Sequence, residues 1–322
     1  FSPSSEHVLV GGDDKTVRVW DCATWQLQAS RTLKKKVSCA VWADDRIVLA
    51  DKTGQVWSME FSAGQLTEEQ LVLGHFSHVT DMRLGTAGET RYLATCDYDQ
   101  KIRVSSYPDL YNIKSFCMGH TSFVGCMAVA GDGRIVTGGS DGQLRLWNVT
   151  TGAQESAVAL ASEMKEDGSE EGSYVACLAF SDNGEVLAAN HTATSISRFT
   201  LTDGVLAASG KPPLPLVSAP LTAQFDSEGR LWVVTEGAVS VFRQTAEGDY
   251  TALADADFNG PVLSGLAACK WEYGTMSNPT LCFLRGADKA RRIKHNADRE
   301  AKKQKILQEA AAEEAADAEM AT

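Results

Sequence analysis

Short runs of alternating apolar and polar residues recur along the chain and predict β-strands. They begin at similar spacings, near the following positions: Val37, Val79, Val124, Val175, Leu221 and Val262. The steps of 41 to 51 residues are typical of a four-stranded blade of a β-propeller. Together with a blade that residues 1–30 enter midway, these starts predict an all-β fold, a propeller of seven blades.

A second repeat supports the same fold. An Asp stands six residues before a Trp or its replacement in four predicted blades: Asp14 before Trp20, Asp51 before Trp57, Asp99 before Ser105 and Asp141 before Trp147. These segments resemble the WD repeat, in which a turn Asp, a His, a Ser or Thr hydroxyl and the Trp form a buried hydrogen-bonded set. The Gly-His pairs ending at His75 and His120, with Thr95 and Thr137, supply the other members. We therefore expect both histidines to be structural rather than catalytic or metal-binding.

The eight cysteines show neither a CxxC pair nor a compact Cys/His cluster, so a zinc site or a small disulfide scaffold is not indicated. Reduced thiols in the cytosol or nucleus are the simpler interpretation. Cys39, Cys126 and Cys177 share one register of three predicted innermost strands, which favours packing over redox chemistry. Asp81 takes the same register in another blade and is expected to line the central channel.

The formal net charge is −12, and the body before Arg285 carries about −13, because the residues from there onward sum to about +1. An acidic body attracts nucleic acid poorly, since non-specific binding depends on Lys and Arg at phosphates. No apolar run is long enough to span a bilayer, so no membrane contact is expected. The chain begins at Phe1 without a signal-peptide pattern, and we interpret it as truncated.

Sequence patterns of catalysis are missing. The chain has no GxGxxG after a strand, no Walker-type phosphate loop, no HExxH and no nucleophile elbow. Propellers of this repeat type present rigid rims to partners. We therefore predict a binding module without catalytic residues, metal or cofactor, and not an enzyme.

Two regions are predicted: a propeller over residues 1–285 and a tail over residues 286–322, helical or disordered, basic and then acidic. The basic part of the tail carries these candidate nucleic-acid contacts: Arg291, Arg292, Lys294, Lys302 and Lys303. The same run can be interpreted as a bipartite nuclear-localisation signal, as an RNA-backbone contact or as a solvated helix face.

Residues 97–124 carry a narrower resemblance. They contain Asp-Tyr-Asp-Gln-Lys-Ile-Arg-Val-Ser and, further on, Ser-Phe-Cys-Met-Gly-His-Thr-Ser-Phe-Val. This stretch is similar to the non-catalytic WD-repeat subunit of the tRNA (guanine-N7-)-methyltransferase. The family usually has Arg between the two Asp and Glu after them, whereas this chain has Tyr98 and Gln100.

The resemblance implies a scaffold that binds and stabilises the catalytic subunit as a heterodimer and supports N7-methylguanosine formation in tRNA. S-adenosylmethionine would then be bound by the partner, and tRNA mainly by the complex. The resemblance implies a partner contact at Arg103, with Lys101 on the same strand face and with Tyr98 and Asp99 in the adjoining turn.

The expected compartment is the nucleus, with the cytoplasm as a second location. The alternative function is a generic WD-repeat adaptor that recruits substrates to a ubiquitin-ligase or chromatin complex.

Overall fold

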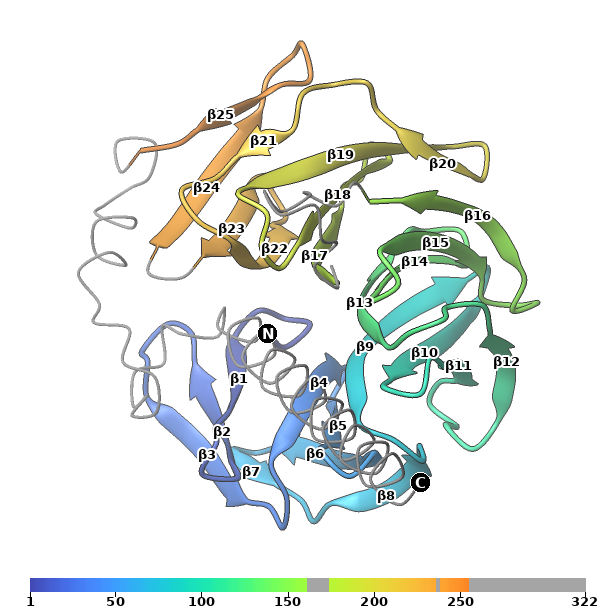
Figure 1. Cartoon of the computed structure of the whole chain (residues 1–322). Coiled ribbons are helices and arrows are strands. Elements are labelled where there is room, and N and C mark those ends of the chain that lie inside the picture. Colours follow the sequence, from blue (N-terminus) through green and yellow to red (C-terminus); the bar gives the residue numbers. More distant parts are fainter. Residues whose placement is uncertain (161–173, 236–237, 255–322) are drawn as a thin grey trace, which may run out of the picture.

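The computed structural model describes residues 1–160, 174–235 and 238–254. In this part of the chain it has strands and no helix, and hence no helix that could cross a membrane. The strands form six antiparallel sheets, the blades, arranged in a ring (Figure 1).

The first three blades contain the following strands. Blade 1 has β1 (His7–Gly11), β2 (Thr16–Asp21) and β3 (Leu27–Thr32). Blade 2 has β4 (Val37–Ala43), β5 (Arg46–Asp51), β6 (Gln55–Ser62), β7 (Gln65–Leu66) and β8 (Gln70–Gly74). Blade 3 has β9 (Val79–Ala87), β10 (Thr90–Asp97), β11 (Ile102–Ser106) and β12 (Ile113–Cys117).

The last three blades follow the same order. Blade 4 has β13 (Val124–Val129), β14 (Arg134–Gly139), β15 (Gln143–Asn148) and β16 (Gln154–Ala159). Blade 5 has β17 (Val175–Phe180), β18 (Glu185–Asn190), β19 (Ser195–Thr202), β20 (Val205–Ala208) and β21 (Leu214–Pro215). Blade 6 has β22 (Pro220–Phe225), β23 (Leu231–Thr235), β24 (Ala238–Gln244) and β25 (Tyr250–Ala252).

The strand starts predicted from the alternation are confirmed for blades 2 to 6, but the number of blades is not. The described residues form six blades, whereas the sequence predicts seven. The seventh start, near Val262, and the tail over residues 286–322 lie outside the described residues. The seventh blade rests on alternation alone, because Phe199 and Phe242 replace the Trp in the later blades and no Asp stands six residues before either.

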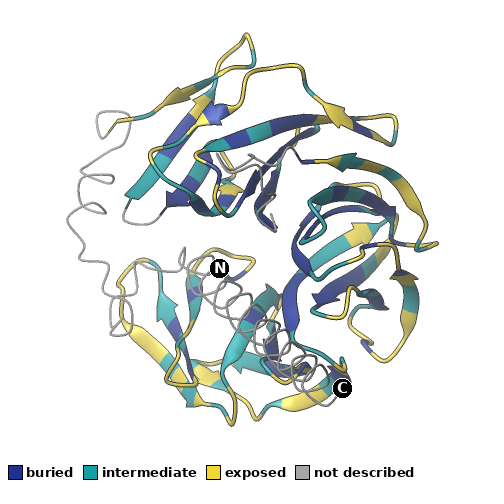
Figure 2. Cartoon of the chain, in the orientation of Figure 1, coloured by how far each residue is buried: buried dark blue, intermediate teal, exposed yellow. Residues whose placement is uncertain are grey.

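Apolar side chains between neighbouring blades make up the core. One cluster lies between blades 3 and 4 and includes Tyr92, Ile102 and Trp147, all fully buried. Figure 2 shows the inner strands as largely buried and the outer strands as largely exposed. Because burying a large apolar side chain stabilises a fold by about 1.5–3 kcal/mol, these seams fix the blades against one another.

The residues in the shared innermost register behave as small core groups. Cys39, Cys126 and Cys177 are buried and take part in no disulfide among the described residues, which confirms their packing role. Asp81 is also buried, at 5% exposure, and does not present its carboxylate to an open channel. It accepts a hydrogen bond from the Met127 N–H at 3.1 Å and pairs with Arg83 at 2.6 Å. A buried carboxylate needs such partners, so Asp81 ties blade 3 to blade 4.

Candidate functional site: the seam between blades 2 and 3

Blade 4 contains the complete hydrogen-bonded set that the repeat predicts. The Nδ1 of His120 lies 3.0 Å from the Asp141 carboxylate, and its Nε2 lies 2.8 Å from the Thr137 hydroxyl. The Trp147 indole N–H donates to the same hydroxyl at 2.8 Å. Since a carboxylate only accepts, Nδ1 carries the proton. The structural role predicted for His120 is therefore confirmed.

The same set makes folding stability depend on acid pH. Burial alone would raise the pKa of Asp141, but hydrogen bonds from His120, Thr121 and Gln143 outweigh it and lower the pKa to about 2. A carboxyl group whose pKa is lowered on folding stabilises the fold above its unfolded pKa, and this contribution disappears as pH falls through the folded pKa. We expect a loss of about 2 kcal/mol between roughly pH 4 and pH 2.

Urea unfolding at stepped pH would measure this loss. The Asp141→Asn variant should be less stable at pH 6 and should lose less on acidification than the parent chain. Asp203→Asn is the matched control, because Asp203 lies in an exposed turn. Equal pH slopes for the parent chain and Asp141→Asn would contradict the prediction.

Blade 3 has an equivalent set, but a different acid takes part. The Nδ1 of His75 lies 2.9 Å from the Asp97 carboxylate, and its Nε2 lies 2.8 Å from the Thr95 hydroxyl. The six-residue spacing predicted Asp99 instead, which is wrong. The Asp-x-Asp motif offers two acids, and only Asp97 is buried, at 1% exposure. Its carboxylate also accepts hydrogen bonds from the backbone N–H groups of Asp99 and Lys101, at 2.9 and 3.0 Å. The fold therefore leaves the Asp99 carboxylate at the surface, with its side chain 50% exposed.

The missing Trp of blade 3 changes the surroundings of Arg103. By strand register, Thr95 pairs with Arg103 as Thr137 pairs with Arg145, so Ser105 stands where blade 4 has Trp147. The Arg103 Nε donates to the Ser105 hydroxyl at 3.0 Å, and its Nη2 donates to the Leu110 carbonyl at 3.2 Å. Both contacts fix the direction of the guanidinium.

Arg103 differs from its repeat equivalents in having no acid. At this repeat position an Arg stands four positions after an Asp in three blades, and Arg18 pairs with Asp14 and Arg145 with Asp141. Arg103 forms no ion pair within the described part of the chain. Burial lowers its pKa. The site thus holds a half-buried cation that is oriented but not neutralised, and such a group favours a carboxylate or phosphate from a partner.

Lys101 has only distant contacts with its surroundings, whereas the Tyr98 ring is held by close stacking. The Lys101 ammonium lies 4.0 Å from the Asp99 carboxylate and 6.0 Å from the centre of the Phe76 ring. Tyr98 stacks on Phe123, with ring centres 4.6 Å apart and planes within 8°. We infer that Lys101 can turn towards a partner, whereas Tyr98 supports the turn.

Exposed apolar residues surround the two cations. Phe116 is the cross-strand partner of Arg103 and is 46% exposed, and Phe76 is 99% exposed. Tyr111, in the loop before β12, donates its hydroxyl to the Leu71 carbonyl of β8 at 3.5 Å, which links the outer strands of the two blades. Together with the two cations, the following exposed residues define the blade 2–3 seam: Leu71, Phe76, Tyr111, Ile113 and Phe116.

Sequence reasoning found the cations of the blade 2–3 seam but not its apolar residues. Ile113 and Phe116 lie three positions apart in the sequence, which does not fit the alternation of a strand and is the one sequence signal that could have found them; both are exposed in the structure. Contiguous exposed apolar residues beside charges are typical of a protein-interaction surface. The candidate nucleic-acid residues Arg291, Arg292, Lys294, Lys302 and Lys303 lie outside the described residues.

Comparison with known families gives two matches. Residues 62–236, more than half of the chain, match the model described as the tRNA methyltransferase TRM82 WD40 domain. Residues 1–21 match the WD domain, G-beta repeat. The first match includes all of the blade 2–3 seam.

Relatives with curated names are similar over part of their length. The chain is 31% identical over 247 residues to the tRNA (guanine-N(7)-)-methyltransferase non-catalytic subunit wdr4 of Danio rerio, covering 73% of this chain and 58% of the relative. It is 31% identical over 170 residues to the WDR4 subunit of Homo sapiens, covering 50% of this chain and 40% of the relative. The TRM82 subunit of Meyerozyma guilliermondii is 36% identical over 118 residues, covering 35% and 28%. The chain thus spans less than two thirds of the length of these relatives.

Solved structures with the same fold are more distant in sequence. A chain in the crystal structure of the mitotic checkpoint complex superposes with a TM-score of 0.62 at 18% identity, covering 73% of this chain and 70% of that one. The WD40 β-propeller domain of Doa1 gives a TM-score of 0.59 at 17% identity, covering 77% and 78%. These likenesses show an all-β WD40 propeller. The longer family match goes further: the chain belongs to the family of the tRNA methyltransferase TRM82 WD40 domain.

Proposed function

We propose that this chain is a non-catalytic subunit that binds and stabilises the catalytic subunit of a tRNA (guanine-N7-)-methyltransferase. The names of the similar curated proteins support the complex, and the blade 2–3 seam supports the mode of binding. The single observation that carries the proposal is Arg103, a half-buried and oriented cation without an acid partner in the described residues.

A carboxylate on the catalytic subunit is the proposed partner of Arg103. The Ser105 hydroxyl and the Leu110 carbonyl already hold two of the guanidinium donors, so binding would cost little side-chain entropy. The exposed Phe116 and Phe76 would exclude water from this ion pair, which strengthens it. Lys101 and Asp99 would complete a charged rim that favours one docking orientation.

The proposed division of labour leaves the chemistry to the partner. S-adenosylmethionine would be bound by the catalytic subunit, and tRNA would be held mainly by the complex. The propeller would contribute a rigid surface, because its blades are fixed by buried seams.

Co-expression with the catalytic subunit tests the proposal. We expect one heterodimer on size-exclusion chromatography, a higher melting temperature of the catalytic subunit, and tRNA guanine-N7 methylation that depends on this chain. Separate elution together with methylation that is indifferent to this chain would refute it and favour a generic adaptor.

The tail carries a separate proposal. Removal of residues 289–305, which include Arg291, Arg292 and Lys303, is expected either to move the protein out of the nucleus or to weaken tRNA binding by the complex several-fold. Imaging of a tagged chain and a salt titration of tRNA binding would separate the two effects. If neither changes, the run is only a solvated helix face. The seventh blade stays a prediction from the sequence.

A further inference from the structure

A cavity of about 460 Å³ opens between blades 1 and 2, away from the blade 2–3 seam. Three aromatic rings form part of its wall. The ring centres of Trp42 and Phe61 are 5.6 Å apart, those of His7 and Phe61 are 5.0 Å apart, and those of His7 and Trp42 are 6.3 Å apart. All three side chains are only partly buried. Such a volume fits a side-chain-sized ligand with part of its backbone.

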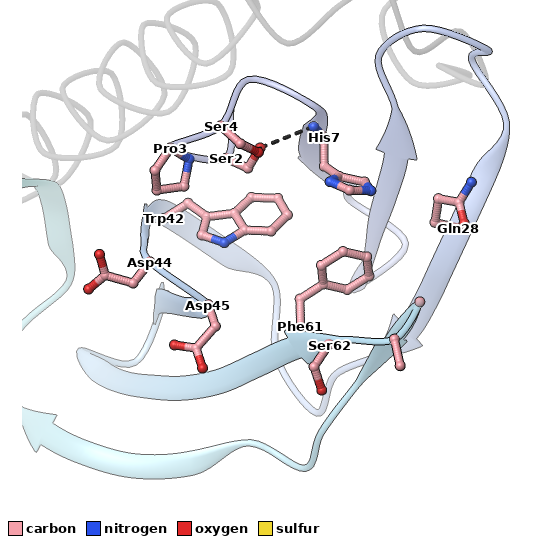
Figure 3. A pocket seen from close by; sticks show the side chains of 12 residues that line it. Ser2, Pro3, Ser4, His7, Gln28, Trp42, Asp44, Asp45, Phe61 and Ser62 are labelled. Carbon is pink, nitrogen blue, oxygen red and sulfur yellow. Dashed lines mark hydrogen bonds between the residues drawn. The ribbon is translucent and has the colours of Figure 1, made fainter.

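Two carboxylates stand in the tight turn between β4 and β5, beside these rings. Figure 3 shows Asp44 and Asp45 on one side of the Trp42 indole and His7 and Phe61 on the other. The backbone N–H of Phe61 donates to the Asp45 carbonyl at 2.9 Å, which keeps the Asp45 turn next to the Phe61 ring.

The two carboxylates differ in whether they are neutralised. Asp44 pairs with Arg91 at 2.6 Å. The next cation along the chain, Arg46, pairs with Glu60 at 3.2 Å. Asp45 has no ion pair within the described residues, so no cation there compensates this carboxylate beside the aromatic wall.

Aromatic faces beside an unpaired carboxylate suit a cation better than a neutral or anionic ligand. The faces of Trp and Phe attract cations, and an alkyl stem packs on the same rings. The acidic body of the chain adds to this preference, since its net charge is −12 with the tail included. His7 is the other titratable group on the wall.

We propose that this cavity binds a cationic side chain on an alkyl stem, namely lysine, methylated lysine or arginine of a partner polypeptide. The cation lies between the Asp45 carboxylate and the Trp42 and Phe61 rings, and the stem fills the apolar part of the cavity. This proposal does not depend on the proposed function, because none of its residues belongs to the blade 2–3 seam.

Ligand-observed NMR titration of the full chain tests the proposal. The probes are the Nα-acetyl amides of lysine, trimethyl-lysine, arginine and norleucine, the last being the neutral control of similar length. We expect the best cation to bind with a Kd in the range of about 0.1–5 mM, and norleucine to bind at least about fivefold more weakly. The order among the three cations identifies which of them the cavity prefers.

Variants locate the binding. Asp45→Asn should weaken cation binding about fivefold or more and leave norleucine unchanged, and Phe61→Leu should weaken the cations more than norleucine. Asp182→Asn removes the same charge from an exposed turn of blade 5 and should have no effect. Melting curves would show whether Phe61→Leu is folded. Asp45 is exposed, so its replacement by Asn should not disturb folding. Three results would each overturn the proposal: norleucine binds as tightly as lysine, Asp45→Asn binds the cations as tightly as the parent chain, or no cation binds at about 10 mM.

Discussion

Charge reversal at Arg103 is expected to abolish the heterodimer at working concentrations while leaving the propeller folded. The Arg103→Glu variant would place a carboxylate opposite the acidic partner group and would leave that group unpaired inside the interface. Losses of this kind cost about 2–5 kcal/mol, which corresponds to a Kd raised by roughly 30-fold to several thousand-fold. Isothermal titration calorimetry with the purified catalytic subunit measures the change.

Arg18 supplies the matched control for this experiment. It stands at the same repeat position in blade 1, but Asp14 already neutralises it. Arg18→Glu should therefore leave the Kd unchanged. An unchanged Kd for Arg103→Glu, with a normal melting temperature, would remove Arg103 from the interface.

Ser105 offers a graded version of the same test. Ser105→Ala removes the hydroxyl that holds the Arg103 Nε, without changing any charge. We expect a Kd raised about three- to tenfold, because the guanidinium loses one of the contacts that orient it. A normal Kd would show that this contact does not orient the side chain for binding.

Replacement of Thr137 by Val is expected to destabilise the propeller by about 2–5 kcal/mol. The hydroxyl joins the His120 Nε2 and the Trp147 indole N–H inside the protein, where neither can reach water. Val has the same shape but leaves both partners unsatisfied, and each buried unsatisfied group costs about 1–3 kcal/mol. The urea midpoint of unfolding measures the loss.

Two further Thr→Val variants calibrate this result. Thr95→Val in blade 3 leaves His75 without its hydroxyl partner, but no Trp shares that hydroxyl, so we expect about half the effect. Thr202→Val in β19 replaces an exposed Thr and should change stability by less than about 0.5 kcal/mol. Equal effects of Thr137→Val and Thr202→Val would refute a stabilising role of the hydrogen-bonded set.

Much of the candidate site could be predicted from the sequence because it follows the repeat. The Gly-His pairs and the hydroxyls have fixed places relative to the strands, and the structure confirms His75, His120, Thr95 and Thr137 in those places. The choice between Asp97 and Asp99 could not be predicted. Both acids lie within reach of the turn, and only the position of the His75 ring in three dimensions selects one of them.

The apolar half of the blade 2–3 seam also needed the structure. Leu71 and Phe116 lie 45 positions apart in the sequence, on the outer strands of different blades. Nothing in the local pattern of either strand says that they belong to one surface, which the Tyr111–Leu71 hydrogen bond joins across the two blades. The cavity beside Trp42 is a similar case, because its aromatic residues come from β1, β4 and β6.

The sequence by itself determined the repeat, the strand starts from Val37 to Leu221, and the family, because period and motif are local properties of the chain. The tertiary structure decided which charges stay unpaired. Asp99 and Arg103 keep the spacing of an ion pair that two other blades form, yet Asp97 binds His75 and Ser105 binds the guanidinium. Whether a charge is neutralised depends on distances between side chains in the folded protein. For that reason only the tertiary structure shows that the Arg103 guanidinium is oriented but has no acid partner among the described residues.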